Sequence, residues 1–199
     1  MQNGNIFIIS GPSGSGKDTI LQDVFKAKKD IFFSISSITR SMRPGDIPGK
    51  YNFISKEEFE KGLENNEYLE YNIFLDNYYG TPKTPILKNI AMGNDVIIEV
   101  DVNGAASIKA KLPEAICIFI MPPSLEILHK RLSERGSETD EQIKKRMDVA
   151  VSEIGRANEY DYIVVNDALE DAVDDFLSIM RSEKLKTSNQ KNLVNEVLK

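Results

Sequence analysis

One glycine-rich run near the N-terminus constrains the fold of this 199-residue chain more than any other feature. Residues 5–10 are a short apolar run that predicts a strand, and residues 17–28 have the pattern of a helix. Between them stands the run Gly11-Pro12-Ser13-Gly14-Ser15-Gly16-Lys17-Asp18-Thr19. A strand, a glycine-rich loop and a helix in this order are typical of a phosphate-binding loop (P-loop), in which backbone N–H groups, the helix N-terminus and a lysine contact phosphates. An ordinary glycine-rich turn is the alternative, and the flanking strand and helix argue against it.

The loop departs from the usual pattern at one position. Ser or Thr usually follows the lysine and binds Mg²⁺ through its hydroxyl, whereas here Asp18 follows Lys17 and Thr19 comes one residue later. The Asp18 carboxylate could bind Mg²⁺, or it could point away and stabilise the helix N-terminus. The sequence leaves both open, so Asp18 and Thr19 are the two candidate metal ligands.

Short apolar runs alternate with helical patterns along most of the chain. Runs rich in Ile, Val and Phe without polar alternation predict the strands of a parallel sheet that is covered on both faces. The alternation predicts an α/β fold with a doubly wound, five-stranded parallel sheet. The expected strands are 5–10, 31–36, 95–100, 115–121 and 161–165, and the expected helices are 17–28, 103–111, 124–135, 140–159 and 168–184.

Two regions interrupt this alternation. Residues 37–93 are rich in Tyr, Asn, Gly and Pro and contain helix-like pieces near 56–65 and 83–92, which predicts an inserted mixed α+β lobe. Residues 134–141 are polar and contain a glycine between two helices, the composition of a mobile lid. We therefore expect one domain over 1–184, with a core of 1–36 and 94–184, the inserted lobe 37–93, a short helical lid at about 131–146 and a polar tail of 185–199.

Composition excludes several classes of function. The formal net charge of −6 argues against a nucleic acid polymer as a partner. No run approaches the ~20 apolar residues that span a membrane. Cys117 is the only cysteine and lies in an apolar run, which excludes a disulfide or a thiolate metal site within the chain and favours a cytoplasmic location. The only histidine, His129, is expected at the surface of a helix.

Arginine is scarce and clustered. Seven arginines occur against eighteen lysines, and five of the seven fall in two short regions. The rigid guanidinium fork contacts phosphate through two hydrogen bonds, so an acidic chain with clustered arginines suits small anionic ligands. The clustered arginines are Arg40, Arg43, Arg131, Arg135 and Arg146.

Carboxylates mark the end of one predicted core strand. Glu99 and Asp101 follow the apolar run that begins near residue 95. Ligands of open α/β sheets bind beyond the carboxyl ends of the strands, where the P-loop also lies. We expect both carboxylates near a ligand.

Six motifs in chain order resemble those of the guanylate kinase family, and the resemblance runs from near the N-terminus to about residue 184. The P-loop is the first motif. The second is the GMP-binding signature Ser-x-x-Thr-Arg-x-x-Arg-x-Gly, followed by Gly-x-x-Tyr-x-Phe. Ser36 to Phe53 match it except that one residue, and not two, separates Gly49 from Tyr51. The others are matched by Tyr78-Tyr79-Gly80, by Glu99 to Gly104, by Arg131 to Gly136 and by Val164 to Asp167. The departures are Asp18, Ile38, Asp46, Thr81 and Asn103, and none removes a side chain that the chemistry requires.

This resemblance implies reversible, Mg²⁺-dependent transfer of the ATP γ-phosphoryl group to GMP, giving ADP and GDP, in purine nucleotide metabolism. It implies dGMP as a further acceptor. The attacking phosphate has a second pKa near ~6 and is mostly ionised at neutral pH, so positive charge and positioning would drive catalysis without a general base. We expect a monomer or a small homo-oligomer.

The resemblance also implies roles for single residues. The transferring phosphoryl group would contact Lys17, Arg131, Arg135 and Arg146. The adenine of ATP would lie near Asn166 and Asp167. Arg40 and Arg43 would hold the GMP phosphate, and Glu70 would accept the N1–H and N2–H₂ groups of guanine, which adenine cannot present. The expected GMP-binding residues are Ser36, Arg40, Arg43, Asp46, Tyr51, Glu70, Tyr79, Thr81, Glu99, Asp101 and Gly104.

Two other functions compete with this reading. Guanylate-kinase-like modules of scaffold proteins bind phosphopeptides without catalysis, but this chain keeps Lys17, Arg131 and Arg135 of the ATP side. Another nucleoside monophosphate kinase would share the core and differ in its base pocket. A GTPase is disfavoured because the Asn-Lys-x-Asp pattern that reads guanine is absent.

Overall fold

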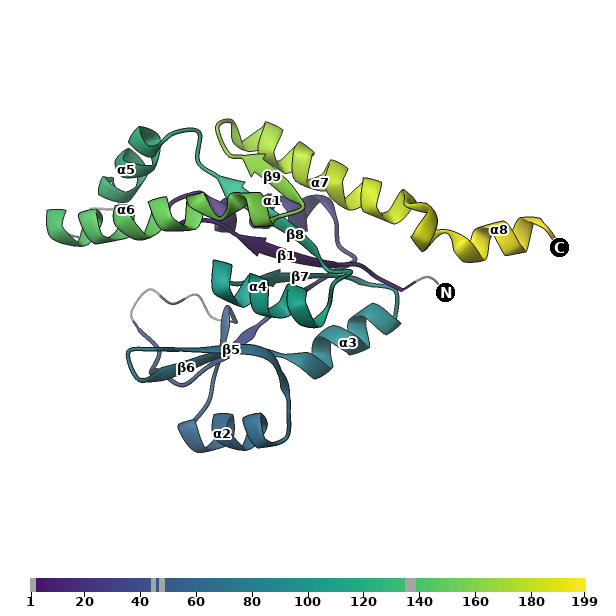
Figure 1. Ribbon diagram of the computed structural model, residues 1–199, viewed down its shortest axis with the longest axis horizontal. Coiled ribbons are helices and arrows are strands. Elements are labelled where there is room, and N and C mark those ends of the chain that lie inside the picture. Colours follow the sequence, from purple (N-terminus) through teal and green to yellow (C-terminus); the bar gives the residue numbers. More distant parts are fainter. Residues whose placement is uncertain (1–2, 44–45, 47–48, 135–138) are drawn as a thin grey trace. The chain divides into compact units, whose positions relative to one another are not determined.

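A computed structural model of the chain describes residues 3–43, 46, 49–134 and 139–199. The fold is α/β, with a five-stranded parallel sheet and a second, mixed sheet of four strands (Figure 1). The order of the first sheet is β2-β7-β1-β8-β9 and that of the second is β4-β3-β6-β5. The predicted fold class is therefore confirmed.

The strands are β1 (Ile6–Ser10), β2 (Ile31–Ser34), β3 (Ser36–Ile38), β4 (Tyr51–Phe53), β5 (Tyr68–Phe74), β6 (Asn77–Pro82), β7 (Asp95–Glu99), β8 (Ile116–Met121) and β9 (Tyr162–Val165). The helices are α1 (Lys17–Ala27), α2 (Lys56–Glu64), α3 (Lys83–Ala91), α4 (Val102–Lys111), α5 (Leu125–Ser133), α6 (Asp140–Gly155), α7 (Leu169–Leu185) and α8 (Lys191–Val197). Short 3₁₀ turns occupy Ala157–Glu159 and Thr187–Asn189.

Contacts between residues divide the chain into two compact units. Unit 1 contains Asn3–Phe7 and Ile31–Ala115, and unit 2 contains Ile8–Asp30 and Ile116–Lys199. The boundary runs through β1.

Unit 1 carries the whole second sheet. Ser36–Ile38 pair in parallel with β4 and in antiparallel register with β6, and β5 and β6 form a hairpin. The hairpin turns at Leu75 and Asp76, both with positive φ, which is the backbone of a two-residue turn that matches strand twist. Helix α2 begins at a capping box in which Ser55 and Glu58 satisfy each other's backbone N–H groups. The inserted region thus contains the expected mixture of strands and helices.

One strand prediction needs correction. We expected a single core strand over 31–36, but β2 ends at Ser34 and Ser36 begins β3 in the other sheet. Ile35 lies between them with 39% of its surface exposed. The apolar run hides the break because both strands use β-forming residues, and pairing with β7 or with β4 decides which sheet each joins.

Unit 2 packs around β8, whose residues Ile116–Ile120 are buried. Helices α1 and α7 contact each other, with Val24 and Phe176 fully buried. Leu128 and Leu132 of α5 pack on Ile143 of α6, and these two helices run side by side in Figure 1.

Strand β9 differs from the expectation of strands covered on both faces. Ile163 and Val165 are 46% and 48% exposed, whereas Val164 between them is buried. The strand lies at the edge of the sheet, and one of its faces is only partly covered. Cys117 is buried and His129 is exposed, as expected. No helix among the described residues is long and apolar enough to cross a membrane.

Candidate nucleotide sites

The P-loop connects β1 to α1 within unit 2, and its glycines adopt backbone angles that side chains rarely take. Gly11 and Gly16 have φ angles of 148° and 91°. A Cβ added at Gly11 would lie 2.3 Å from the Ile120 carbonyl oxygen, and one at Gly16 would lie 2.1 Å from the Asn166 amide nitrogen. Glycine is therefore required at both positions by conformation and by space.

The lysine of the loop is held by the loop itself. The Lys17 ammonium donates to the carbonyl oxygens of Gly11 and Pro12 at 2.6 and 3.2 Å. Helix α1 starts directly after Gly16 and has no side-chain cap, so the positive end of its dipole lies at the loop. The loop, the helix end and the ammonium are together the groups that a phosphate site requires.

Two buried polar atoms near the loop lack a partner. Among the described residues, the Ser15 hydroxyl and Nη1 of Arg131 make no hydrogen bond. Nη2 of Arg131 donates to the Asn166 carbonyl oxygen at 3.0 Å, which fixes the guanidinium beside the loop. Unpartnered buried polar groups are costly unless a ligand satisfies them, so this arrangement suits an oxygen-rich anion.

Of the other two arginines predicted in the lid, Arg146 is described by the structure and Arg135 is not. Nη1 of Arg146, on α6, donates to the Ser13 hydroxyl of the P-loop at 3.1 Å. Arg135 and Gly136 lie outside the described residues. Helix α6 begins at a capping box formed by Thr139 and Gln142, which fixes where its first turn starts.

The candidate metal ligands Asp18 and Thr19 lie in the first turn of α1, and both are exposed. No group of three or more His, Cys, Asp or Glu side chains in the described part of the chain could hold a metal ion.

Unit 1 brings five of the predicted acceptor residues to one face of the second sheet. Glu70 pairs with Thr81, Ser36 with Tyr51, and Tyr79 with both Ile38 and Asn72. Paired residues and alternate residues along a strand share a face. The side chains on this acceptor face are Ser36, Ile38, Tyr51, Phe53, Glu70, Asn72, Tyr79 and Thr81.

Glu70 is the buried acid of this face. Only 9% of its surface is exposed, and its Oε1 accepts a hydrogen bond of 2.5 Å from the Thr81 hydroxyl. Burial raises the pKa of the Glu70 carboxyl, the Thr81 hydrogen bond lowers it in part, and the nearby charge of Asp101 raises it. The result is a desolvated carboxylate with an oxygen to accept from a ligand.

The first turn of α4 closes the other side of Glu70. A Cβ added at Gly104 would lie 3.4 Å from Oε2 of Glu70, an ordinary contact distance, so this turn lies beside the carboxylate. Asp101 caps α4 by accepting from the N–H groups of Asn103 and Gly104, and its second oxygen accepts from Asn72 at 3.3 Å. Asp101 thus links the first turn of α4 to β5.

Arg40 is held by a carboxylate rather than exposed to solvent. Its two terminal nitrogens donate to the two oxygens of Asp46 at 2.6 and 2.8 Å, and its guanidinium lies 5.6 Å from the ring centres of Tyr51 and Phe53. This pairing holds the pKa of Arg40 well above, and that of Asp46 well below, their usual values. Tyr79 also hydrogen-bonds Arg40.

Arg43 and Glu99 are two further residues of unit 1 that were predicted to bind GMP. The Arg43 backbone N–H donates to Asp46 at 2.7 Å, and its residue surface is exposed. Glu99, at the end of β7, forms an ion pair of 3.9 Å with Lys50. Lys50 precedes β4 directly, so this pair ties the end of β7 to the edge of the acceptor sheet.

The comparisons with known proteins show the family of this chain. The sequence model of the guanylate kinase family matches residues 3–183. A protein named guanylate kinase from Carboxydothermus hydrogenoformans is 46% identical over 187 residues, covering 94% of this chain and 92% of its own. The chain belongs to the guanylate kinase family. It is therefore a kinase.

Other members of the guanylate kinase family extend the likeness. A guanylate kinase from Clostridioides difficile is 42% identical over 200 residues, covering 100% of this chain and 98% of its own. The crystal structure of guanylate kinase from Anaplasma phagocytophilum is 30% identical with a TM-score of 0.76, covering 94% of this chain and 90% of that one. A shikimate kinase from Bacteroides thetaiotaomicron, at 14% identity and a TM-score of 0.51, shares the fold alone.

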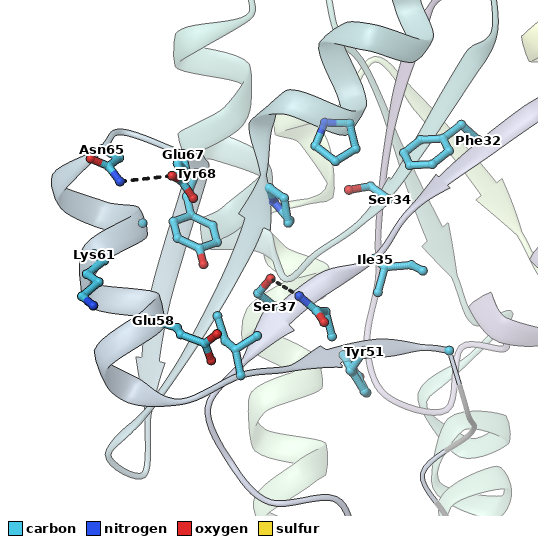
Figure 2. Close-up of a pocket in the computed structure, with 16 residues that line it drawn as sticks. Phe32, Ser34, Ile35, Ser37, Tyr51, Glu58, Lys61, Asn65, Glu67 and Tyr68 are labelled. Carbon is cyan, nitrogen blue, oxygen red and sulfur yellow. Dashed lines mark hydrogen bonds between the residues drawn. The ribbon is translucent and has the colours of Figure 1, made fainter.

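One cavity of unit 1 lies away from the acceptor face. A cavity of about 680 Å³ lies between α2 and the other face of the second sheet (Figure 2). Ser37 and Asn52, which alternate with Ser36 and Tyr51, form part of it and hydrogen-bond each other. Of the predicted acceptor residues that the structure describes, Tyr51 alone lines this cavity.

Sequence reasoning missed several residues that support these guanylate kinase motifs. Phe59 of α2 is fully buried against the rings of Tyr68 and Tyr78, beneath Gly80. The Lys111 ammonium donates to the Leu69 carbonyl oxygen, next to Glu70, at 2.5 Å. Aromatic spacing in α2 and β5 could have suggested the first contact, and no local signal points to the second.

Asn166 was predicted near adenine, and its amide has a different contact in the structure. The amide nitrogen donates to the Ser15 carbonyl oxygen at 2.7 Å, in a side chain that is buried. Asp167 beside it is exposed. The adenine contact stays a prediction.

Proposed function

We propose that this chain catalyses the reversible transfer of the γ-phosphoryl group of ATP to GMP, giving ADP and GDP, in purine nucleotide metabolism. The observation that carries the proposal is the buried Glu70 carboxylate bonded to Thr81 on the acceptor face. A carboxylate can accept from both N1–H and N2–H₂ of guanine, and adenine offers no such pair of donors. Membership in the guanylate kinase family supports the same substrates.

The GMP phosphate would be bound by Arg40, Arg43, Tyr51 and Tyr79. Arg40 and Tyr51 are in contact, and Tyr79 hydrogen-bonds Arg40, so the three form one cluster at the end of β3. Asp46 orients Arg40, and Ser36 lies beside Tyr51 in the register of the sheet. GMP and dGMP present the same base and phosphate, so both are proposed as acceptors.

The donor ATP would lie on the P-loop with its phosphates at residues 11–19. Lys17 and the N–H groups of the loop would hold the β- and γ-phosphates, and Nη1 of Arg131 has hydrogen-bonding capacity that a phosphate oxygen would satisfy. Arg146, bonded to Ser13, and Arg135 are proposed to add positive charge.

The chemistry needs no general base. A GMP phosphate oxygen, mostly ionised at neutral pH, attacks the γ-phosphorus as the bond to the bridging oxygen of ADP breaks. The arginines and the P-loop stabilise the charge that spreads over the transferring group.

Mg²⁺ is proposed as the metal that accompanies ATP. It prefers oxygen ligands and keeps several waters, which fits the exposed carboxylate of Asp18 and hydroxyl of Thr19 beside Lys17. When bound, it would neutralise charge on the β- and γ-phosphates. The single cysteine, Cys117, is buried and supports a cytoplasmic location for the enzyme.

The test is an acceptor panel. Purified protein is incubated with ATP and each of GMP, dGMP, AMP and UMP, with and without Mg²⁺, while ADP formation is followed. We expect Mg²⁺-dependent ADP formation with GMP and dGMP. No ADP with any acceptor would favour a non-catalytic binding module, and a preference for AMP or UMP would favour another nucleoside monophosphate kinase.

A further inference from the structure

We infer that Asn166 is a positioning residue that sets the peptide orientation of the P-loop for binding triphosphate. The inference rests on the proposed function in one respect, that the loop holds the phosphates of ATP. It assigns the Asn166 side chain to the loop backbone rather than to the base.

Three hydrogen bonds converge on this one residue within unit 2. The side-chain amide donates to the Ser15 carbonyl oxygen at 2.7 Å. The Asn166 backbone N–H donates to the Met121 carbonyl oxygen at 2.8 Å, and its own carbonyl oxygen accepts from Arg131 at 3.0 Å. The residue is 6% exposed. It therefore joins the end of β8, the P-loop and the lid arginine through buried contacts.

The bond to Ser15 has a direct consequence for phosphate binding. No cis peptide occurs in the described chain, and in a trans peptide the C=O and the following N–H point in opposite directions. When Asn166 holds the Ser15 carbonyl, the Gly16 N–H is turned away from Asn166, where it is free to donate to a phosphate. Gly16 itself does little to fix the orientation of the Ser15–Gly16 peptide, because glycine populates positive and negative φ about equally.

The spacing at Gly16 indicates that the fit is specific. A Cβ on Gly16 would lie 2.1 Å from the Asn166 amide nitrogen, so the amide occupies the space that a side chain would otherwise take. The glycine of the loop and the asparagine after β9 are thus complementary in shape. A longer side chain at 166 would not fit in this position.

The side chain and the backbone of Asn166 act on different partners. Removing the amide frees the Ser15–Gly16 peptide, whereas the Asn166 carbonyl that holds Arg131 remains. A loss of loop order should therefore weaken triphosphate binding more than it slows the transfer step. We expect Asn166→Ala to raise the KM for ATP roughly tenfold, the factor that one lost buried hydrogen bond would produce, with the KM for GMP unchanged.

Inorganic tripolyphosphate separates the loop role from an adenine contact, because it has phosphates but no base. Its inhibition constant against ATP is measured for the wild-type chain, Asn166→Ala and the isosteric Asn166→Asp. If Asn166 acts through the loop, the constant rises by the same factor as the KM for ATP. We expect the larger rise in Asn166→Asp, since a carboxylate would face the Ser15 carbonyl and repel the phosphates.

Asn189→Ala is the matched control. Its amide donates to the Glu183 carbonyl oxygen at 2.8 Å, an equivalent bond outside the P-loop, and its loss should leave both constants unchanged. An unchanged tripolyphosphate constant with a raised KM for ATP would overturn the inference in favour of an adenine contact. Unchanged values for both would overturn any donor role.

Calorimetric binding of tripolyphosphate needs no turnover and keeps the two proposals distinct. A wild-type chain that binds tripolyphosphate but forms no ADP would contradict the proposed reaction and leave the role of Asn166 measurable. If Asn166→Ala fails to fold, the isosteric Asn166→Asp variant carries the test.

Discussion

Glu70 is where the structure exposes a conflict between stability and recognition. The carboxyl is buried, and burial raises its pKa, so ionising it in the folded state costs free energy. The free-energy cost of ionising Glu70 is absent at low pH, where the carboxyl is protonated in both the folded and the unfolded state. It destabilises the fold as pH rises through the raised pKa of Glu70. The same ionised oxygens are what guanine requires.

We predict that Glu70→Gln lowers kcat/KM for GMP by roughly 10²-fold or more, because two charge-assisted hydrogen bonds at ~1.5–3 kcal/mol each would be weakened or lost. The KM for ATP should stay unchanged. The unfolding temperature at pH 7.5 should equal or exceed that of the wild type, because the amide carries no ionisation cost. Steady-state kinetics and thermal unfolding provide the two measurements.

Glu67→Gln is the control for this substitution, since Glu67 is an exposed carboxylate that lines the cavity behind the sheet. It should leave the KM for GMP unaltered. Equal losses in both variants would show that total charge, and not the position of Glu70, sets the affinity for GMP.

The Thr81 hydroxyl lowers the pKa of the buried Glu70 carboxyl on the acceptor face. Its hydrogen bond lowers the pKa of Glu70, so removing the hydroxyl in Thr81→Val should raise that pKa further. Protonation removes the acceptor, so kcat/KM for GMP should fall on the acid side, and the fall should begin at a higher pH in the variant. The ratio of variant to wild type across pH 5–8 cancels the titration of the GMP phosphate. A ratio that does not change with pH would contradict the coupling.

At this scale the sequence identified residue types better than contacts. Motif spacing singled out Arg40 and Asp46, but nothing in the sequence indicated that Asp46 would occupy both ends of the Arg40 fork. Asn166 and Ser15 are 151 residues apart, and no local pattern predicts a bond across that separation. Contacts of this kind depend on tertiary packing, which propensity and periodicity do not encode.

The packing of α2 on the second sheet explains one motif at the scale of elements. Gly80 follows two tyrosines in β6, and a Cβ there would lie 2.6 Å from the Phe59 ring and 2.9 Å from the Tyr68 ring. Phe59 and Tyr68 stack at 4.3 Å between ring centres. The glycine of Tyr78-Tyr79-Gly80 thus makes room for the helix on the face opposite Tyr79 and Glu70.

We predict that Gly80→Ala destabilises the fold by about 1–3 kcal/mol through overpacking against Phe59. Thermal unfolding should register this as a fall of several degrees, since ~1 kcal/mol shifts a chain of this size by ~2–4 °C. Combining it with Phe59→Leu, which shortens the ring, should cost less than the sum of the two changes.

Gly155→Ala, at the end of α6 with open space around it, is the matched glycine control. It should be neutral or slightly stabilising, because alanine favours helix. If Gly80→Ala were equally neutral, the contact between α2 and the sheet would not explain the glycine.

Elements were predicted well where hydrophobic pattern and punctuation agree. The helix-like pieces at 56–65 and 83–92 became α2 and α3, and the P-loop strand and helix lie where the glycines separate them. The division of 31–36 into β2 and β3 could not be seen, because no Gly or Pro marks Ile35. The short helix α8 in the polar tail also lacked a signal strong enough to predict.

For the whole molecule, alternation of strands and helices was sufficient to predict the α/β class, since a parallel sheet requires a crossover between its strands. The division into two compact units was less accessible. Unit 1 joins Asn3–Phe7 to Ile31–Ala115, so one strand of the sheet contributes to both units. Such a boundary depends on the density of contacts in three dimensions.

This division yields a prediction about where each nucleotide acts. Every described acceptor residue belongs to unit 1, and the P-loop, Arg131, Arg146 and Asn166 belong to unit 2. A ligand that binds the folded state stabilises the contacts around it, by ~2.7 kcal/mol at one hundred times its Kd. GMP alone should slow hydrogen exchange in residues 36–43 and 68–82, and a non-hydrolysable ATP analogue should slow it in residues 11–19 and 162–167.

Hydrogen exchange followed by mass spectrometry measures both patterns on the intact chain, and exchange in residues 191–197 of α8 provides an internal reference. If GMP alone protected residues 11–19 and not residues 68–82, the prediction that GMP binds unit 1 would be wrong. Protection of the expected segments by each ligand, lost selectively in Glu70→Gln for GMP and in Asn166→Asp for the ATP analogue, would link each residue to its own nucleotide. The two variants then serve as controls for one another, because each should retain the pattern that the other loses.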